Sequence, residues 1–170
     1  SATAGLFRGN ANLGREKSHT VELGASARMG SWSTQGALFF RRDEGLVDWT
    51  FRRGVTARTA NAVDIDTTGV EFVARRSSSA VDLVIGYTAM TKASGYRGAL
   101  VDASFYALNY AQHRLTAALT ARLGYGLELR MDNAARLQAA NALRVVGGDR
   151  ALTTALGLAF RPAGWRGAEI

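Results

Sequence analysis

Residues 113 to 123 read HRLTAALTARL, and this stretch decides the fold. Every second residue from Leu115 to Leu123 is apolar, whereas arginine, threonine and alanine stand between them. Side chains of a β-strand alternate between its two faces, so this period of two predicts a strand with one apolar and one polar face. Tilted as barrel strands are, such a stretch spans roughly 25 Å, the height of the apolar band of a membrane-spanning barrel. A strand of a soluble antiparallel sandwich shows the same alternation, so both interpretations remain open at this point.

The composition excludes several classes of protein. Apolar residues make up 47% of the 170 residues, so a disordered chain is not expected. The chain has no cysteine, and its two histidines, His19 and His113, lie far apart in the sequence, so we expect no metal site and no cofactor. The net charge of +7 would suit a nucleic-acid-binding protein, but the arginines are scattered singly or in pairs. We therefore expect no nucleic-acid partner.

The sequence contains no helical membrane span. No apolar run is long enough for such a helix, and the first residues show neither the basic nor the apolar region of a secretory signal. If the chain crosses a membrane, we expect it to do so with strands, and we expect any export signal to lie outside the sequence given.

The alternation of residues 113–123 recurs along the chain. Residues 1–16 are rich in glycine, asparagine and alanine and are predicted to form a loop. Besides residues 113–123, the predicted strands cover residues 18–29, 32–42, 62–76, 81–89, 125–131 and 150–161, and an eighth begins at 165–170. In the strand 62–76 the apolar row changes face near Gly69, so we predict a bulge or a strand end there.

Short and long connections alternate between these strands. Tight turns are predicted near residues 30, 78, 124 and 163, and long connections at 43–61, 91–107 and 132–149. Apolar residues between Leu46 and Phe51 interrupt the first long connection, so we expect strand extensions there. Alternating connections place all tight turns at one end of the sheet, as in membrane barrels, whereas a sandwich mixes lengths at both ends. The prediction is an all-β, antiparallel up-and-down meander of about seven to eight strands, a segment of a transmembrane β-barrel.

Aromatic residues gather near the predicted strand ends. Membrane barrels carry aromatic girdles at both membrane interfaces, although aromatic residues are also common in strands generally. The candidate interface aromatics are Trp32, Tyr125, Phe160 and Trp165 beside tight turns, and Tyr110 beside a long loop.

No catalytic motif is present. The sequence lacks a G-x-S-x-G elbow, an H-E-x-x-H pair and a phosphate-binding loop, so we do not expect an enzyme. His113 stands at the loop end of a strand, where a rim histidine is favoured over a general base. Asp64 and Asp66 share a strand face and would suit calcium, but paired rim carboxylates are the favoured interpretation.

The first long connection holds the candidate ligand-binding residues Asp48, Trp49, Arg52 and Arg53. An indole offers a stacking surface and two guanidinium groups offer paired donors, which suits an anionic ligand or a metal chelate. The alternatives are a solvated loop and a loop in contact with lipopolysaccharide.

Three groups of residues resemble the C-terminal barrel region of TonB-dependent outer-membrane receptors. The sequence departs from the family pattern at Ala11, Arg15 and Ala111, where the family usually has prolines that brace the loops. The resembling residues are Gly9, Asn10, Leu13, Glu16, Lys17, Ser18, Glu22, Leu23 and Gly24; then Asn61, Thr68, Gly69, Val70 and Glu71; and then Leu108, Asn109, Tyr110, His113, Arg114 and Leu115.

This resemblance implies a barrel of about 22 strands with an N-terminal plug. Residues 1–170 are then expected to be a single barrel segment without the plug and the final strands. The implied function is uptake of a scarce nutrient, such as a ferric siderophore or cobalamin, across the bacterial outer membrane. The implied partners are membrane lipid, lipopolysaccharide, the small-molecule or metal-chelate ligand, and the TonB complex through the plug. A small, complete structural or adhesion barrel and a soluble β-sandwich binding module remain the alternatives.

Overall fold

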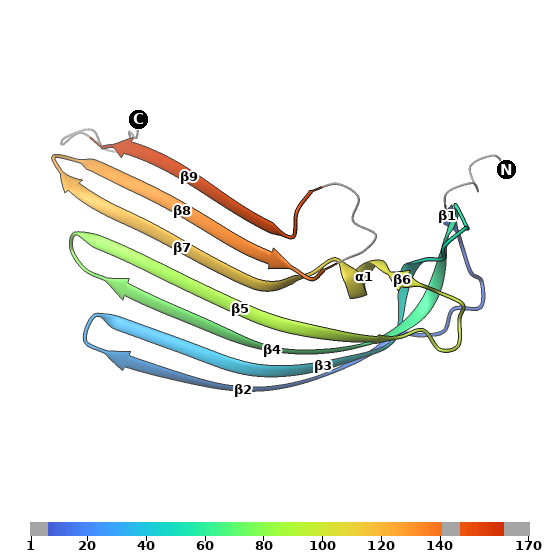
Figure 1. The fold of residues 1–170 in the computed structure, drawn as a ribbon. Coiled ribbons are helices and arrows are strands. Elements are labelled where there is room, and N and C mark those ends of the chain that lie inside the picture. Colours follow the sequence, from blue (N-terminus) through green and yellow to red (C-terminus); the bar gives the residue numbers. More distant parts are fainter. Residues whose placement is uncertain (1–6, 141–146, 162–170) are drawn as a thin grey trace.

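The computed structural model describes residues 7–140 and 147–161 (Figure 1). Consecutive long strands form one antiparallel meander, so the predicted all-β fold is confirmed. The predicted eighth strand at 165–170 lies outside the described residues. The long strands are β2 (Lys17–Met29), β3 (Trp32–Phe51), β4 (Arg58–Ser77), β5 (Val81–Gly95), β7 (Ala111–Gly124), β8 (Leu127–Gln138) and β9 (Arg150–Phe160). The short elements are β1 (Phe7–Arg8), β6 (Ala103–Ser104) and the one-turn helix α1 (Phe105–Leu108).

Tight turns lie at one end of the sheet and the longer connections at the other, as Figure 1 shows. The predicted turns near residues 30, 78 and 124 are confirmed, and the turn near 163 lies outside the described residues. Gly30 (φ 58°) and Gly124 (φ 91°) adopt left-handed conformations that the turns require. Tyr125 (φ 53°) is part of its turn, so the predicted strand start at this residue is wrong and β8 begins at Leu127.

Several strands extend further toward the loop end than the sequence predicts. β3 continues to Phe51 and β4 begins at Arg58, so the expected strand extensions are confirmed, but most of 43–61 is strand rather than connection. Likewise β5 reaches Gly95 and β8 reaches Gln138. At the end of β5, Thr91 and Lys92 place polar side chains on both faces, which removes the alternation. In β3 the residues from Val47 to Phe51 still alternate, but the register shift between Asp43 and Leu46 separates them from the strand that precedes them.

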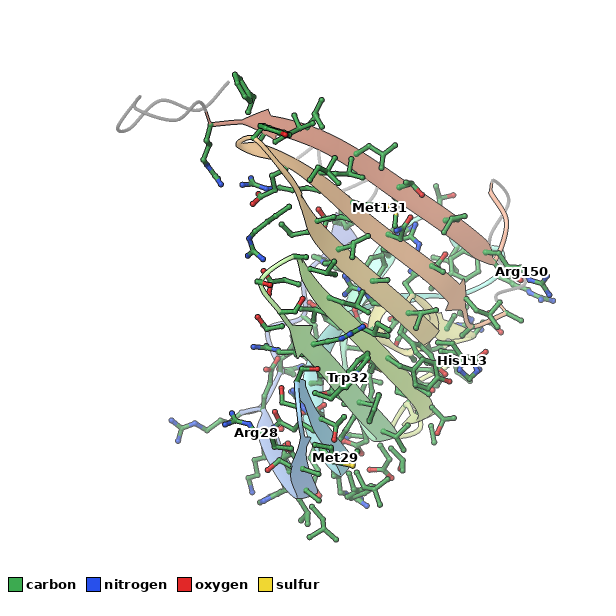
Figure 2. All side chains as sticks on the ribbon, turned by 90° about the vertical axis from the view of Figure 1, so that its left-hand side faces the viewer. Arg28, Met29, Trp32, His113, Met131 and Arg150 are labelled. Carbon is green, nitrogen blue, oxygen red and sulfur yellow. The ribbon has the colours of Figure 1, made fainter. Side chains whose placement is uncertain are left out.

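The long strands separate their side chains into an apolar face and a polar face. Figure 2 shows Arg28 on one side of the sheet, which is the polar face. His113 and Arg150 lie on the other side, at the loop end of the apolar face. On the apolar face Leu23 and Leu152 are 75% and 74% exposed, and among the described residues no second layer covers them. A β-sandwich would bury this face, whereas lipid covers it in a membrane barrel. No helix in the described parts of the chain is long and apolar enough to cross a membrane.

The strands are staggered across the sheet. The row of paired residues that starts at the first turn, with Met29 opposite Trp32, runs through Arg76 and Leu83 to Leu119 on β7. Leu119 stands several residues before the turn at Gly124, so each strand is displaced along its neighbour. Strands that are displaced in this way tilt relative to the axis of a barrel.

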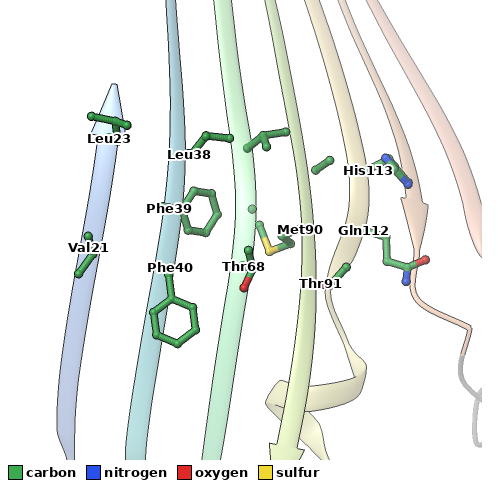
Figure 3. Close-up of a pocket in the computed structure, with 13 residues that line it drawn as sticks. Val21, Leu23, Leu38, Phe39, Phe40, Thr68, Met90, Thr91, Gln112 and His113 are labelled. Carbon is green, nitrogen blue, oxygen red and sulfur yellow. The ribbon is translucent and has the colours of Figure 1, made fainter. Parts of the chain in front are cut away.

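The bulge predicted near Gly69 is absent there and lies at Gly45 instead. Gly69 pairs regularly with Phe39 on one side and Met90 on the other. In Figure 3 the Phe39 ring and the Met90 side chain point toward each other across β4, and the ring leaves no room for a Cβ atom on Gly69. The pairing of β3 with β4 shifts between Asp43 and Leu46, around Gly45 with φ 66°. Gly69, where the alternation of the sequence changes face, therefore makes room for the Phe39 ring, and the backbone pairing of β4 continues past it.

Candidate functional site

We call the part of the sheet level with the apolar row Leu115 to Leu123 of β7 the apolar band. Beyond this band, β3 and β4 continue as a two-stranded extension, and the short strands β6 and β1 pair with its two edges. β2 begins opposite Glu44 and β5 ends opposite Asp64, so neither long neighbour reaches the end of the extension. β6 pairs with the free edge of β3, and β1 pairs in parallel with the free edge of β4. The connection between β5 and β7, residues 96–110, therefore crosses the polar face to reach β3. Edge pairing of this kind satisfies backbone groups that would otherwise lack partners.

A buried carboxylate holds this connection in place. Asp48 is 3% exposed, and its Oδ2 accepts a hydrogen bond of 2.8 Å from the backbone N–H of Tyr106 in α1. Its Oδ1 accepts one of 2.7 Å from the N–H of Trp49. Asp102 accepts from the N–H of Arg53 at 2.6 Å, so a second carboxylate joins the connection to the end of β3. A buried carboxylate that accepts backbone N–H bonds fixes the position of the segment that donates them.

An ion pair joins the same connection to β4. The Arg97 Nε donates to both oxygens of Asp64 at 2.9 Å, and the Gly45 N–H donates to Asp64 Oδ1 at 2.8 Å. The guanidinium of Arg97 holds the pKa of Asp64 below its ordinary value, while partial burial opposes this and the Gly45 N–H reinforces it. Asp64 in turn raises the pKa of Arg97. Asp64 lies in the extension and Arg97 in the connection after β5, so both groups lie beyond the apolar band.

Asp64 and Asp66 are each engaged with an arginine rather than converging on a common point. Arg42 lies 3.8 Å from Asp66 and 3.0 Å from Glu44. Within residues 7–140 and 147–161, no group of three or more histidine, aspartate or glutamate side chains is placed to hold a metal ion. The favoured interpretation of paired rim carboxylates fits this arrangement.

A pocket of about 410 Å³ lies on the polar face where the crossing connection passes over it, and we call it the inner pocket. Arg41, Thr67 and Lys92 form one row across β3, β4 and β5 at its centre. Tyr106 of α1 lines it as well and remains half exposed. The residues that line the inner pocket are Phe39, Arg41, Asp43, Leu46, Ile65, Thr67, Met90, Lys92 and Tyr106.

Two cations of the inner pocket are positioned by neighbouring groups. Arg41 Nε donates to both oxygens of Asp43 at 2.9 Å, which orients the guanidinium, yet the Arg41 side chain remains 51% exposed. Lys92 Nζ donates to the Tyr106 carbonyl at 3.1 Å and lies 5.2 Å from the centre of the Tyr110 ring. Both cations retain N–H groups that these contacts do not use. Above an apolar floor, such a pair suits a ligand with an anionic group and a flat or apolar body.

The four ligand-binding candidates from the sequence do not converge on one place. Asp48 lies on the polar face and is buried under α1, whereas Trp49 points to the opposite face and contacts the Phe7 ring edge-on at 4.9 Å. Arg52 and Arg53 lie in the exposed turn between β3 and β4. A ligand-binding role for these residues stays a prediction.

The sequence alone does not single out the pocket-forming residues Arg41, Lys92 and Tyr106. Arg41 and Lys92 continue the polar rows of their strands past the apolar band, a signal that is visible in the sequence. Their proximity depends on the register of three strands, which the sequence does not show.

The candidate interface aromatics occupy both ends of the sheet. Trp32 lies at the first turn, with the Arg76 guanidinium 5.9 Å from its ring centre. Phe160 ends β9 and is 41% exposed, and Tyr125 is fully exposed in its turn. The Tyr110 hydroxyl accepts from the Lys92 N–H at 3.2 Å, so this residue is engaged with β5. Trp165 lies outside the described residues, and membrane contact by these rings stays a prediction.

No protein-family model and no curated protein match this sequence. The structure is similar to the FrpB iron transporter from Neisseria meningitidis in two variants. For the F3-3 variant the TM-score is 0.68 at 16% identity, covering 94% of this chain and 26% of that chain. For the F5-1 variant, an apoprotein form, the TM-score is 0.65 at 17% identity, covering 92% and 26%. This chain therefore spans about a quarter of the length of these transporters, and its fold is that of a segment of a transmembrane β-barrel.

Proposed function

We propose that this chain is part of an outer-membrane receptor that takes up a scarce nutrient, such as a ferric siderophore or cobalamin, with energy from the TonB complex. The observation that carries the proposal is the inner pocket, where a loop folded over the polar face places two positioned cations above an apolar floor. The uncovered apolar face and the similarity in fold to iron transporters support a membrane location. The proposed location is the bacterial outer membrane.

In this proposal the chain binds its ligand and carries out no covalent reaction. Arg41 and Lys92 bind an anionic group of the ligand, and Phe39, Met90 and Tyr106 contact its apolar part. Trp49, Arg52 and Arg53 offer a first contact at the outer end of the β3–β4 extension. The coupling to TonB is proposed to pass through a plug that residues 1–170 do not include.

Ligand binding by the full-length receptor tests this proposal. A ferric catecholate siderophore and cyanocobalamin serve as probes, and quenching of tryptophan fluorescence reports binding. Arg41→Gln and Lys92→Gln should each weaken binding of the recognised probe roughly tenfold, because each removes a charged hydrogen bond to the ligand.

Arg114→Gln is the matched control, since Arg114 lies on the polar face of β7 but does not line the inner pocket. Wild-type affinity in all three variants would contradict the assignment of the pocket. A receptor that binds neither these probes nor other small metal chelates would favour the alternative of a structural or adhesion barrel.

A further inference from the structure

A second hollow lies on the apolar face, at its end nearest the long connections. It has a volume of about 470 Å³ and spans β5, β7, β8 and β9. We call it the outer groove, because it opens on the face opposite the inner pocket. On this face its lining residues are Tyr87, His113, Leu115, Ala135, Leu137, Arg150 and Leu152.

The outer groove lies where the apolar band ends. One row of paired residues, from Tyr87 through Leu115 to Leu152, is still largely apolar. The next row on the same face contains His113 and Arg150, paired through Leu137. From Leu115 the apolar row of β7 runs about nine residues to the tight turn, the length needed to cross the hydrocarbon layer. The two basic residues therefore stand at the level of lipid headgroups in a membrane barrel.

Arg150 has no acidic partner among the described residues. The same face shows a different arrangement on β3 and β4, where Arg42 is paired with Glu44 and Asp66. On this face, the charge of Arg42 on β3 is therefore neutralised by acidic residues of the protein, whereas the charge of Arg150 on β9 is left available. In a membrane the available counter-charge is the anionic headgroup of a lipid.

The imidazole of His113 is held in position. The Tyr87 hydroxyl lies 2.8 Å from His113 Nδ1, and the two rings are stacked with their centres 6.2 Å apart. When this hydroxyl donates to Nδ1, the ring proton is on Nε2, which becomes a donor for an outside acceptor. Arg150 contributes a planar fork of donors that matches a phosphate group.

We propose that the outer groove binds a phosphate-bearing lipid of the surrounding leaflet. Its phosphate accepts hydrogen bonds from Arg150 and His113, and one acyl chain lies over Leu115 and Leu152. Leu152 is 74% exposed, so it offers apolar surface to such a chain. The inference uses the membrane placement of the apolar face but is independent of which nutrient the receptor binds.

Native mass spectrometry of the full-length receptor in detergent tests this inference. The probes are bisphosphorylated lipid A and the same lipid with its phosphates removed. The wild type should bind the phosphorylated form at least about tenfold more tightly, and Arg150→Gln should remove most of this preference, since one charged hydrogen bond is lost. Arg150→Lys should retain part of it, and His113→Gln should lower it more moderately.

Arg114→Gln again serves as the control, because Arg114 is next to His113 in the sequence but points to the polar face. Equal lipid binding by Arg150→Gln and Arg114→Gln would overturn the proposal. Displacement of the lipid by millimolar inorganic phosphate would also overturn it, since that result indicates a site for the bare anion. If nutrient binding at the inner pocket is intact in the same preparations, failure here concerns the outer groove alone.

Discussion

The guanidinium of Arg97 and the carboxylate of Asp64 form a two-pronged ion pair that joins the connection after β5 to the outer end of β4. Arg97 Nε lies 2.9 Å from both carboxylate oxygens, and Arg97 Nη2 lies 2.7 Å from Oδ1. The same connection contributes Tyr106 to the inner pocket. The ion pair therefore helps to fix the connection that carries Tyr106, from a position on the other face of the extension.

Acidification should loosen this connection. The pKa of Asp64 is lower in the folded protein than in the unfolded chain, so the stabilisation is complete above the ordinary aspartate value of about 3.9. It is lost as the pH falls through the lower, folded value. Protease sensitivity of residues 96–104, assayed after acid pulses, should rise in this range in the wild type. In Asp64→Asn the sensitivity should be high already at neutral pH, and an unchanged profile would contradict the role of the pair.

Arginine should be tolerated on one face of β7 and not on the other. Leu119 lies on the apolar face near the middle of the apolar band, so in the proposed membrane placement Leu119→Arg should cost about 2 to 4 kcal/mol in the free energy of unfolding. Thr120→Arg should cost much less, because its side chain points to the polar face. Folding titrations of the full-length protein in lipid vesicles measure both values. Equal costs would remove the membrane assignment.

Adding a methyl group at Gly69 should destabilise the sheet. A Cβ atom there meets the Phe39 ring and the Ala89 carbonyl, so Gly69→Ala should cost about 1 to 3 kcal/mol through overpacking. Gly157→Ala is the control, since its added Cβ meets only the Arg130 Cβ at 3.8 Å. Combining Gly69→Ala with Phe39→Ala should recover part of the loss, and urea unfolding in vesicles is the measurement. A Gly69→Ala variant as stable as the control would show that the ring moves aside freely.

Removing the Asp48 carboxylate should release α1 and weaken the inner pocket. Asp48→Ala leaves the Tyr106 N–H without its acceptor, which should cost about 1 to 3 kcal/mol in local stability. Hydrogen exchange at residues 103–108 should accelerate, and ligand binding should weaken with it. Glu22→Gln, an exposed change on β2, should alter neither. Unchanged exchange in Asp48→Ala would mean that the pairing of β6 with β3 holds the connection without the carboxylate.

Residues 1–170 expressed alone should not form a stable monomer in plain buffer. Among the described strands, β2 and β9 each leave one edge unpaired along the band, and exposed residues such as Leu23, Leu152 and Leu156 share one uncovered face. Light scattering without detergent should therefore detect oligomers or aggregates. A monodisperse monomer under these conditions would contradict the barrel interpretation.

The sequence by itself determined the strands within the apolar band, their two faces and the tight turns. These features are local: alternation from Leu115 to Leu123 follows from the geometry of a single strand, and Gly30 and Gly124 supply left-handed conformations within their own turns. The predicted bulge at Gly69 was wrong because the space beside this glycine is filled by Phe39, a residue on another strand.

Only the tertiary structure decided the register, the lengths of the extensions and the inner pocket. Arg41, Thr67 and Lys92 meet because three strands pair in one alignment, and a shift of one residue would place them on opposite faces. The contact between Asp48 and Tyr106 joins residues 58 positions apart. The alternation from Val47 to Phe51 indicates a strand, but nothing local to Asp48 or Tyr106 indicates that a loop will fold over the sheet and bring them together.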